Sequence, residues 1–453
     1  MSEQNQSIHG QWSSRLAFIL AVSGSAVGLG NIWKFPYITG VNGGGAFVLV
    51  YLLCILAIGL PILMSEIMLG RLGHKNPIAT MKILGQRESG TTKWSVIGIL
   101  GVFTGALILS YYSVVAGWAM NYVLLSVQGT LASVDSDSAG QLFGGMVSNP
   151  INVFFWHSLF MLLTVFIVAK GLISGIEKSI RILMPLLIFL LLVLLVFSVI
   201  NGEALAALSF LFSFNFDALT GDGVLVALGH AFFTLSLGMG AVMAYGAYLP
   251  KDFSLSKTAG AIVFFDTAIA LVAGIVIFSV VFANDLDPTQ GPGLIFQTLP
   301  IAFSSLPLTS VVAFIFFILL VAAAWTSSIS LIEPGVAWLI EDFGFSRKTA
   351  TYTLGGLIWL LGLLSVFSFN HLADFTFWQG TWFDNFDFLT ANLLLPFGGL
   401  LITVFAGWIL SPNISKEEID LGGKLGYRIW LFLSRYIAPA GIIIIFLDGL
   451  GVI

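Results

Sequence analysis

The chain has 453 residues, of which 58% are hydrophobic and only 9% carry a charged side chain. Soluble domains carry about 25% charged residues, so this composition excludes a soluble protein and indicates a membrane protein with several spans. The formal net charge of −5 identifies no partner, because in a membrane protein the distribution of charge matters more than its sum.

Hydropathy predicts eleven membrane-spanning helices. A helix satisfies its own backbone hydrogen bonds in lipid, and about 20 apolar residues cross the hydrocarbon layer. The predicted spans, in chain order, are residues 16–38, 44–69, 95–127, 152–170, 180–200, 224–248, 257–283, 309–340, 351–369, 384–410 and 428–448. No small-residue cleavage site follows the first apolar run, so we expect a retained first helix rather than a signal peptide.

Lysine and arginine cluster in every second connection between the spans. Examples are Arg71, Lys75 and Lys82 after the second span, and Lys416 and Lys424 after the tenth. The other connections hold acidic residues and essentially no cations. Because cations favour cytoplasmic loops, we expect a cytoplasmic N-terminus and, after eleven spans, an extracytoplasmic C-terminus.

The first and sixth spans each contain a Gly-x-Gly near their middle, at Gly28 and Gly30 and at Gly238 and Gly240. Glycine costs about 1 kcal/mol inside a helix, so two such pairs predict local unwinding. Tight helix–helix packing at small residues is the alternative, weakened by the equivalent placement of the two pairs. Breaks five spans apart have opposite orientation, which indicates an inverted repeat. The predicted units are two five-helix repeats and an accessory eleventh span: residues 1–205, 206–412 and 413–453.

Unwinding in lipid frees backbone groups that only a ligand or water can satisfy. The half-helix that ends at a break presents carbonyls to a cation, and the half-helix that begins beyond it presents N–H groups to a carboxylate. A zwitterionic amino acid together with sodium fits this pair of environments. Polar side chains within the apolar spans that could contribute oxygen ligands are Asn31, Thr234, Asp266, Thr326 and Ser327.

Asp266 lies in an apolar span that contains no cation. A carboxylate at membrane depth is costly unless it is paired. Two interpretations stay open: a bound cation neutralises it, or it is protonated or bonded to a polar neighbour. His157 and His230, near the outer ends of their spans, are expected in packing or pore lining.

Motifs along nearly the whole chain resemble the neurotransmitter:sodium symporter family, whose members share the LeuT fold. The matching segments are "WSSRLAFILAVSGSAVGLGNIWKFP" (12–36), "NGGGAF" (42–47), "GLP" (59–61), "SYYSVVAGW" (110–118), "FFTLSLGMGA" (232–241), "AAAWTSSISLIEP" (322–334) and "DNFDF" (384–388). The resemblance implies an all-α integral membrane protein with a 5+5 inverted repeat and eleven helices, as in some bacterial members. It also implies a transporter rather than an enzyme, in the bacterial inner membrane, as a monomer or weak dimer with no nucleic-acid partner.

The same resemblance implies two sodium sites and one central substrate site. The first sodium site would use Ala26, Asn31, Thr234 and Asp266. The second would use Gly24, Val27, Ala323, Thr326 and Ser327. The amino-acid substrate would contact Ala26, Leu29, Gly30, Ile108, Tyr112, Phe233, Thr234, Ser236, Met239, Ser327 and Leu331.

The family pattern further implies gates on both sides of the substrate. Lys34 and Asp387 match an outer charged gate, and Tyr112 with Phe233 match an aromatic lid. Trp12 and Glu341 match the inner gate. There the chain departs from the family, because His9 replaces the usual arginine, which predicts either a weaker, pH-sensitive gate or another cation in its place.

A second departure concerns chloride. The family usually has asparagine at the position of Asp266, and chloride-dependent members have serine at the position of Ala270. A carboxylate at Asp266 could offset the charge of sodium directly, so we expect sodium-coupled import of a neutral, hydrophobic or aromatic amino acid without chloride. Proton coupling, another small solute and a sodium-gated channel are the alternatives that stay open.

Overall fold

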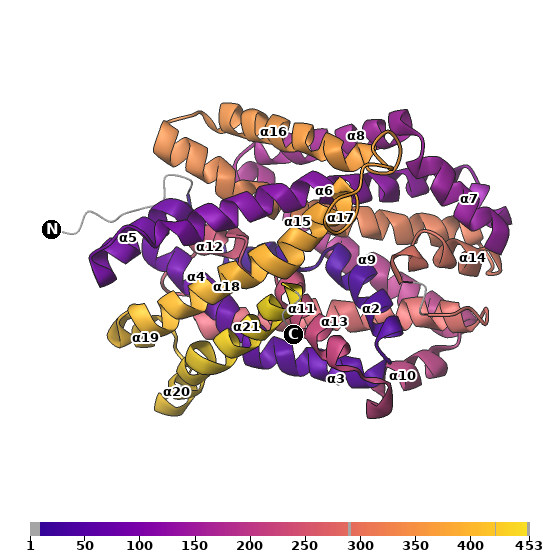
Figure 1. Ribbon diagram of the computed structural model, residues 1–453. Coiled ribbons are helices and arrows are strands. Elements are labelled where there is room, and N and C mark those ends of the chain that lie inside the picture. The colour runs from indigo at the N-terminus through magenta and orange to yellow at the C-terminus, as the bar shows by residue number, and fades with distance from the viewer. Residues whose placement is uncertain (1–9, 289–290, 422, 451–453) are drawn as a thin grey trace.

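The computed structural model describes residues 10–288, 291–421 and 423–450, which form helices joined by short connections (Figure 1). Within these residues, nine continuous helices are long and apolar enough to cross a membrane. They are Gly45–Gly73, Ser95–Val127, Pro150–Val168, Leu172–Asn201, Leu255–Phe282, Thr309–Phe343, Arg347–Phe367, Trp382–Ile409 and Lys424–Gly449. Each lies at the position of a predicted span, which confirms an all-α membrane protein.

The first and sixth predicted spans are broken helices. In the first, α1 (Arg15–Ala26) is followed, after a break, by η1 (Gly30–Lys34) and α2 (Phe35–Val41), with a bend of 51°. In the sixth, α11 (Gly221–Thr234) and α12 (Ala241–Gly246) flank six residues without regular helix. Both breaks fall at the predicted glycine pairs, so the prediction of local unwinding is confirmed.

The remaining elements complete a bundle around these breaks (Figure 1). Their bounds are α3 Gly45–Cys54, η2 Ile55–Gly59, α4 Leu60–Gly73, α5 Pro77–Ser89, α6 Ser95–Val127, η3 Thr130–Ser133, α7 Ser136–Val147, α8 Pro150–Val168, η4 Leu172–Glu177, α9 Lys178–Asn201, α10 Ala204–Phe212, η5 Phe216–Ala218, α13 Leu255–Phe282, η6 Gly291–Leu294, α14 Thr298–Ser304, α15 Thr309–Phe343, α16 Arg347–Phe367, α17 Trp382–Phe388, η7 Leu389–Leu394, α18 Leu395–Val404, η8 Phe405–Ile409, α19 Pro412–Glu418, α20 Lys424–Phe432, η9 Leu433–Ile437 and α21 Ala438–Gly449.

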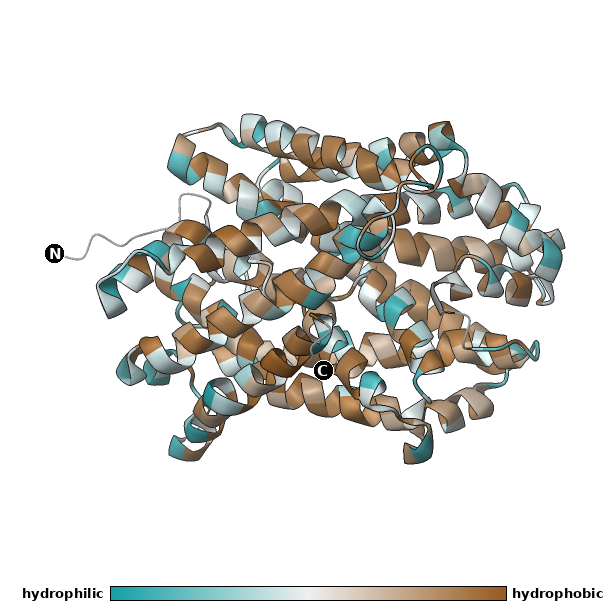
Figure 2. Cartoon of the chain, in the orientation of Figure 1, coloured by the Kyte–Doolittle hydropathy of each residue, from teal (hydrophilic) through white to brown (hydrophobic). Residues whose placement is uncertain are grey.

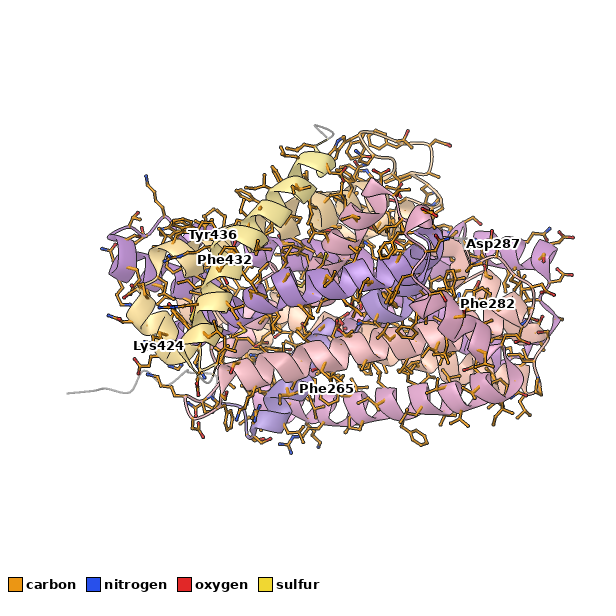
Figure 3. All side chains as sticks on the ribbon, turned by 90° about the horizontal axis from the view of Figure 1, so that it is seen from below. Phe265, Phe282, Asp287, Lys424, Phe432 and Tyr436 are labelled. Atoms are coloured by element: carbon orange, nitrogen blue, oxygen red, sulfur yellow. The ribbon has the colours of Figure 1, made fainter. Side chains whose placement is uncertain are left out.

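Polar residues gather at the two ends of the bundle, and hydrophobic residues dominate between them (Figure 2). Lys424 and Asp287 lie at opposite ends, while Phe432 and Tyr436 lie on the outer surface of the last span (Figure 3). These two rings are 54% and 50% exposed, as expected for a helix that faces lipid on one side.

Small residues bring α6 close to the broken sixth span and to α15. A Cβ atom at Gly101 would lie 2.9 Å from the backbone nitrogen of Gly240, and one at Gly105 would lie 3.0 Å from the carbonyl oxygen of Leu331. Such close approach of helices is typical of small residues at membrane-helix interfaces. It places α6 and α15 against the α11–α12 break and forms the walls of a site.

Candidate ion and substrate site

The carbonyl groups at the end of α1 have few donors. The helix stops at Ala26 because Val27 is extended, with φ −73° and ψ 100°. The last carbonyls of any α-helix lack an intrahelical partner. Here the N–H of Gly28, which would continue the helix, donates instead to Oδ1 of Asn31, at 3.1 Å. The end of α1 is therefore a cluster of carbonyl oxygens, partly negative and deep in the bundle.

The hydroxyl of Ser327 on α15 lies among these oxygens. Four carbonyl oxygens lie within 3.5 Å of Ser327 Oγ: Ser25 at 3.1 Å, Ala323 at 3.3 Å, Gly24 at 3.4 Å and Val27 at 3.5 Å. One hydroxyl has one hydrogen to donate, so it cannot satisfy four acceptors. Hard cations such as sodium are bound by this kind of oxygen-rich environment.

Thr326 extends the same oxygen cluster. Its hydroxyl donates to the carbonyl of Ala323 at 2.9 Å. A Cβ atom at Gly24 would lie 3.3 Å from that of Thr326, so glycine lets α1 and α15 approach closely here. The structure thus brings together all five residues predicted for the second sodium site.

Three of the four residues predicted for the first sodium site bond to one another. Asn31 Nδ2 donates to Asp266 Oδ1 at 2.8 Å, to the Asp266 carbonyl at 3.1 Å and to Thr234 Oγ1 at 3.2 Å. Thr234 donates to the same carboxylate, at 3.1 and 3.2 Å from its two oxygens. All three side chains are fully buried. Ala26, the fourth residue, contributes a backbone carbonyl and lines the cavity described next.

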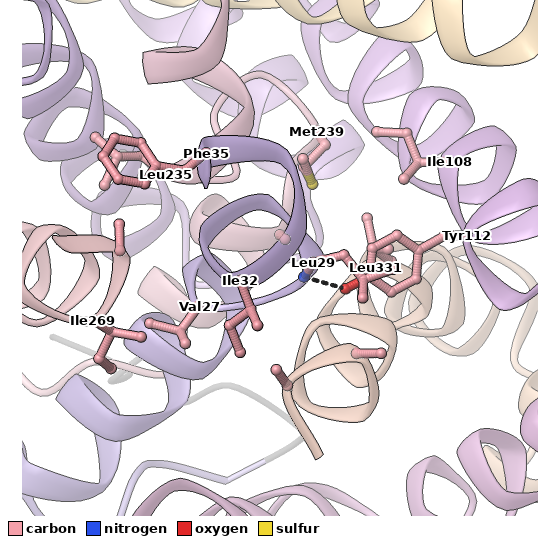
Figure 4. Packing of buried hydrophobic residues seen from close by; sticks show 14 of the residues in the cluster. Val27, Leu29, Ile32, Phe35, Ile108, Tyr112, Leu235, Met239, Ile269 and Leu331 are labelled. Carbon is pink, nitrogen blue, oxygen red and sulfur yellow. Dashed lines mark hydrogen bonds between the residues drawn. The ribbon is translucent and has the colours of Figure 1, made fainter. Parts of the chain in front are cut away.

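A small central cavity lies between the two breaks, α6 and α15. Its lining residues are Ser25, Ala26, Gly28, Leu29, Gly30, Ile108, Tyr112, Phe233, Ser236, Met239, Ser327 and Leu331. Every predicted substrate contact lies on this wall except Thr234, which bonds within the neighbouring Asn31–Asp266 group. Figure 4 shows Met239, Ile108, Leu331 and Tyr112 around the unwound segment of the first span.

Gly28 is required by the narrowness of this cavity. A Cβ atom at this position would lie 2.5 Å from the hydroxyl of Ser327 and 2.8 Å from that of Tyr112. The next backbone N–H, of Leu29, donates to the Tyr112 hydroxyl at 3.2 Å, the bond drawn in Figure 4. This bond uses the one hydrogen of the Leu29 amide, so the Tyr112 hydroxyl at the beginning of the second half-helix is the group that can donate to a carboxylate.

Two aromatic side chains separate the central cavity from a larger one. Tyr112 and Phe233 line both the central cavity and the larger one, which we call the gate cavity. The predicted gate residues Lys34 and Asp387 also line the gate cavity. The ammonium group of Lys34 lies 4.6 Å from the centre of the Phe233 ring, within range of a cation–π contact. All four predicted residues of the lid and outer gate therefore lie together.

The two inner-gate residues have different partners. Trp12 is 3% exposed, and its indole N–H donates to the carbonyl of Tyr245 at 3.0 Å. Glu341 accepts hydrogen bonds from the backbone and side chain of Asn76, both at 2.9 Å. His9 lies outside the described residues, so its predicted pairing with Glu341 stays a prediction.

Two residues that hold the breaks together were absent from the predicted site. Glu66 on α4 is fully buried and accepts a hydrogen bond from the backbone N–H of Gly238, in the unwound part of the sixth span. The carbonyl of Ser25 accepts a hydrogen bond from Ser236, at 2.9 Å, which links the two breaks, and another from Ser327 of α15. Glu66 stands out in the sequence as a charge in an apolar span, but a backbone carbonyl gives no such signal.

Comparison with known proteins agrees with this geometry. The model of the sodium:neurotransmitter symporter family matches residues 9–139 and 147–450. An uncharacterized sodium-dependent transporter of Bacillus subtilis is 37% identical over 456 residues, with both chains fully covered. Another from Haemophilus influenzae is 33% identical over 446 residues, covering 97% of this chain and 98% of that protein.

A solved structure extends the agreement to three dimensions. The crystal structure of MhsT in complex with L-phenylalanine is 45% identical to this chain and covers 97% of it, with a TM-score of 0.89. This chain covers 99% of that one. The family match, the relatives and the shared fold point to the same conclusion: this chain belongs to the sodium:neurotransmitter symporter family and is a sodium-dependent, multi-pass membrane transporter with the LeuT fold.

Proposed function

We propose that this transporter imports a neutral, hydrophobic or aromatic amino acid together with sodium, by alternating access. The observation that carries the proposal is the meeting of two unwound segments at one cavity, with a carbonyl cluster around Ser327 and a buried carboxylate at Asp266. These are environments for two cations beside donors for a carboxylate.

The lining of the central cavity supports a hydrophobic substrate. Ile108, Phe233, Met239 and Leu331 supply apolar surface, and no described residue that lines this cavity is charged. Hydrophobic pockets discriminate weakly between side chains of similar size, so we propose a class of substrates rather than one amino acid. The phenylalanine bound to MhsT is consistent with this class.

The proposed mechanism couples ion binding to closure of the site. Sodium bound at the two breaks would order spans 1, 6, 7 and 8, and the substrate carboxylate would complete the first coordination shell. Tyr112 and Phe233 then close over the substrate. Spans 1, 2, 6 and 7 rock against the others and open the second sodium site toward the cytoplasm, where lower sodium favours release.

We propose that chloride is not required. The Asp266 carboxylate bonds to Asn31 and Thr234, the two other side chains of the proposed first sodium site. Sodium bound among these side chains would lie beside the full negative charge of the carboxylate, which would offset the charge of the ion without chloride. Replacing chloride by gluconate should therefore leave transport nearly unchanged, and a large loss would contradict this part of the proposal.

Proton coupling is the rival within transport, because a buried carboxylate can also carry a proton. A sodium-gated channel is the rival of another class. It requires a continuous polar path, whereas Tyr112 and Phe233 close the central cavity toward the gate cavity.

A thermal-shift screen of purified protein against all standard amino acids tests the proposal. A ligand at about 100 times its dissociation constant stabilises the folded state by about 2.7 kcal/mol. We expect hydrophobic and aromatic amino acids to raise the melting temperature in sodium but not in choline. Equal stabilisation in both salts, or none by any amino acid, would contradict it.

A further inference from the structure

Spans 10 and 11 pack against each other through two π-helical turns, η8 and η9. The helix of span 10 ends at Ile409, because Leu410 is extended, with φ −65° and ψ 133°. The last carbonyls of a helix lack an intrahelical partner. One of these carbonyls, that of Gly407, accepts a hydrogen bond from Nε of Arg435 on η9. Span 11 therefore brings a cation to the end of span 10.

The side chain of Arg435 lies close against span 10. A Cβ atom at Gly407 would lie 3.0 Å from Cγ of Arg435, so a larger residue there would push the arginine away. The guanidinium carbon of Arg435 lies 5.3 Å from the ring centre of Trp408, within range of a cation–π contact. The indole N–H of Trp408 donates to the Arg435 carbonyl at 3.3 Å. Span 10 thus holds both the side chain and the backbone of this arginine.

The terminal nitrogens of Arg435 remain available to a ligand. In the part of the chain that the structure describes, the hydrogen bond from Nε is the one that this guanidinium makes. No carboxylate among the described residues forms an ion pair with it. An arginine within a membrane span is costly unless it is paired. Its planar fork of N–H donors suits an oxyanion, and phosphate most of all in a membrane.

The surroundings of Arg435 face lipid. Trp408, Phe432 and Tyr436 are each half-exposed, and Tyr436 touches both other rings, with centres 5.5 Å from Trp408 and 5.6 Å from Phe432. Phe432 and Tyr436 lie on the outer surface of span 11 (Figure 3). Tryptophan and tyrosine gather at the level of the lipid headgroups. We therefore expect the guanidinium at the boundary between the headgroups and the acyl chains.

Two more cations lie nearer the end of span 11. Lys424 and Arg428 are exposed on α20, the part of the span that precedes η9. About two helical turns separate Arg428 from Arg435. Basic surfaces between membrane helices attract acidic lipid headgroups, so the charge of this region favours an anionic lipid over a neutral one.

A second copy of this chain is the other occupant that an exposed aromatic surface could have. In a two-fold dimer the same surface of both chains would meet. The cations at Arg428 and Arg435 would then approach the same cations of the other chain, and like charges repel strongly near a low-dielectric membrane. An anionic phospholipid neutralises these charges instead.

We propose that the surface formed by Trp408, Phe432, Arg435 and Tyr436 binds one anionic phospholipid, such as phosphatidylglycerol. The guanidinium of Arg435 pairs with the phosphate, and the three aromatic rings cover the beginning of the acyl chains. The lipid would hold the accessory eleventh span to span 10. None of these four residues lines the central cavity or the gate cavity, so this lipid site does not depend on the proposed substrate.

Three substitutions separate a phosphate site from a general attraction between cations and anionic lipid. Arg435→Gln removes the charge. Arg435→Lys keeps the charge and a donor for the Gly407 carbonyl but loses the planar fork. The matched control is Arg428→Gln, the same loss of charge at an exposed position of the same span.

Native mass spectrometry of the purified protein in detergent measures the dissociation constant of the first bound lipid. Phosphatidylglycerol is compared with phosphatidylethanolamine, a neutral lipid, on the same acyl chains. We expect Arg435→Gln to raise the dissociation constant of phosphatidylglycerol about fivefold or more, and Arg428→Gln less than about twofold. Arg435→Lys should lie between the unmodified protein and Arg435→Gln. Unchanged binding of phosphatidylethanolamine by all variants shows that their surfaces are intact.

The other outcomes overturn the lipid site. Equal affinity of the unmodified protein and Arg435→Gln for phosphatidylglycerol excludes Arg435 from binding the lipid. Equal weakening by Arg435→Gln and Arg428→Gln shows attraction by charge alone. Full affinity in Arg435→Lys contradicts recognition of the phosphate by the guanidinium fork. Dimers of the unmodified protein that Arg435→Gln dissociates would assign this surface to a second copy of the chain.

Discussion

Asp266 supplies the negative charge in the group formed with Asn31 and Thr234. Asp266→Asn keeps the shape of the side chain but removes the charge that would balance sodium. We expect the sodium concentration for half-maximal amino-acid binding to rise about tenfold or more, where tenfold corresponds to about 1.4 kcal/mol. A sodium titration of L-phenylalanine binding measures this change. The control is Asp217→Asn, the same substitution at an exposed position. An unchanged titration would remove Asp266 from the sodium site.

Ser327 tests the second sodium site separately. Ser327→Ala removes the hydroxyl that lies within 3.5 Å of four carbonyl oxygens, so the proposed second sodium site loses one oxygen ligand. If this ligand contributes about 1 kcal/mol to the free energy of sodium binding, its loss should raise the dissociation constant for sodium about fivefold. The matched control is Ser328→Ala, whose hydroxyl bonds to the Ala324 carbonyl of its own helix at 2.8 Å. Equal sodium affinity in the two variants would contradict the assignment.

Among the elements, the break in the sixth span depends on a bond from another helix. Glu66 on α4 accepts a hydrogen bond from the backbone N–H of Gly238. The φ angle of Gly238 is +80°, a backbone conformation that residues other than glycine rarely adopt. Glu66→Ala leaves that N–H buried and unpaired, which should cost about 1–3 kcal/mol and lower the melting temperature. Glu66→Gln keeps an acceptor and should restore most of the loss.

Ser65→Ala is the matched control for Glu66, because its hydroxyl bonds within α4 to the Pro61 carbonyl at 2.7 Å. Melting curves without added ligand compare the variants. If Glu66→Ala melts at the same temperature as Ser65→Ala, this bond does not support the break.

The elements could be predicted well from sequence and their contacts could not. Long apolar runs predict the spans, and the two glycine pairs predict both breaks. The bond from Glu66 to Gly238 joins residues 172 positions apart, and the continuous apolar sequence around Glu66 gives no preferred face. Ser25 acts through its carbonyl, so its side chain predicts nothing about it. Five oxygen ligands could be predicted as polar side chains within apolar spans: Asn31, Thr234, Asp266, Thr326 and Ser327. Their division between two sodium sites, and the remaining sodium and substrate contacts, followed from family resemblance.

For the whole molecule, the charge distribution predicts orientation. The helices α5 and α7 lie at opposite ends of the bundle (Figure 1). Because cations cluster around α5, we expect that end in the cytoplasm. In a Cys54→Ala background, Ser148→Cys after α7 should react with a membrane-impermeant maleimide on intact cells. Ser89→Cys on α5 should react after permeabilisation. Both positions are exposed, and the reverse pattern would invert the proposed topology.

Transport driven by a sodium gradient is the central claim. Purified protein in proteoliposomes is given radiolabelled L-phenylalanine with an inward sodium gradient, with equal sodium on both sides, or with a proton gradient and no sodium. We expect accumulation above equilibrium with the sodium gradient alone, and nearly unchanged when gluconate replaces chloride. Accumulation driven by the proton gradient without sodium, or equal uptake in all three conditions, would contradict the account.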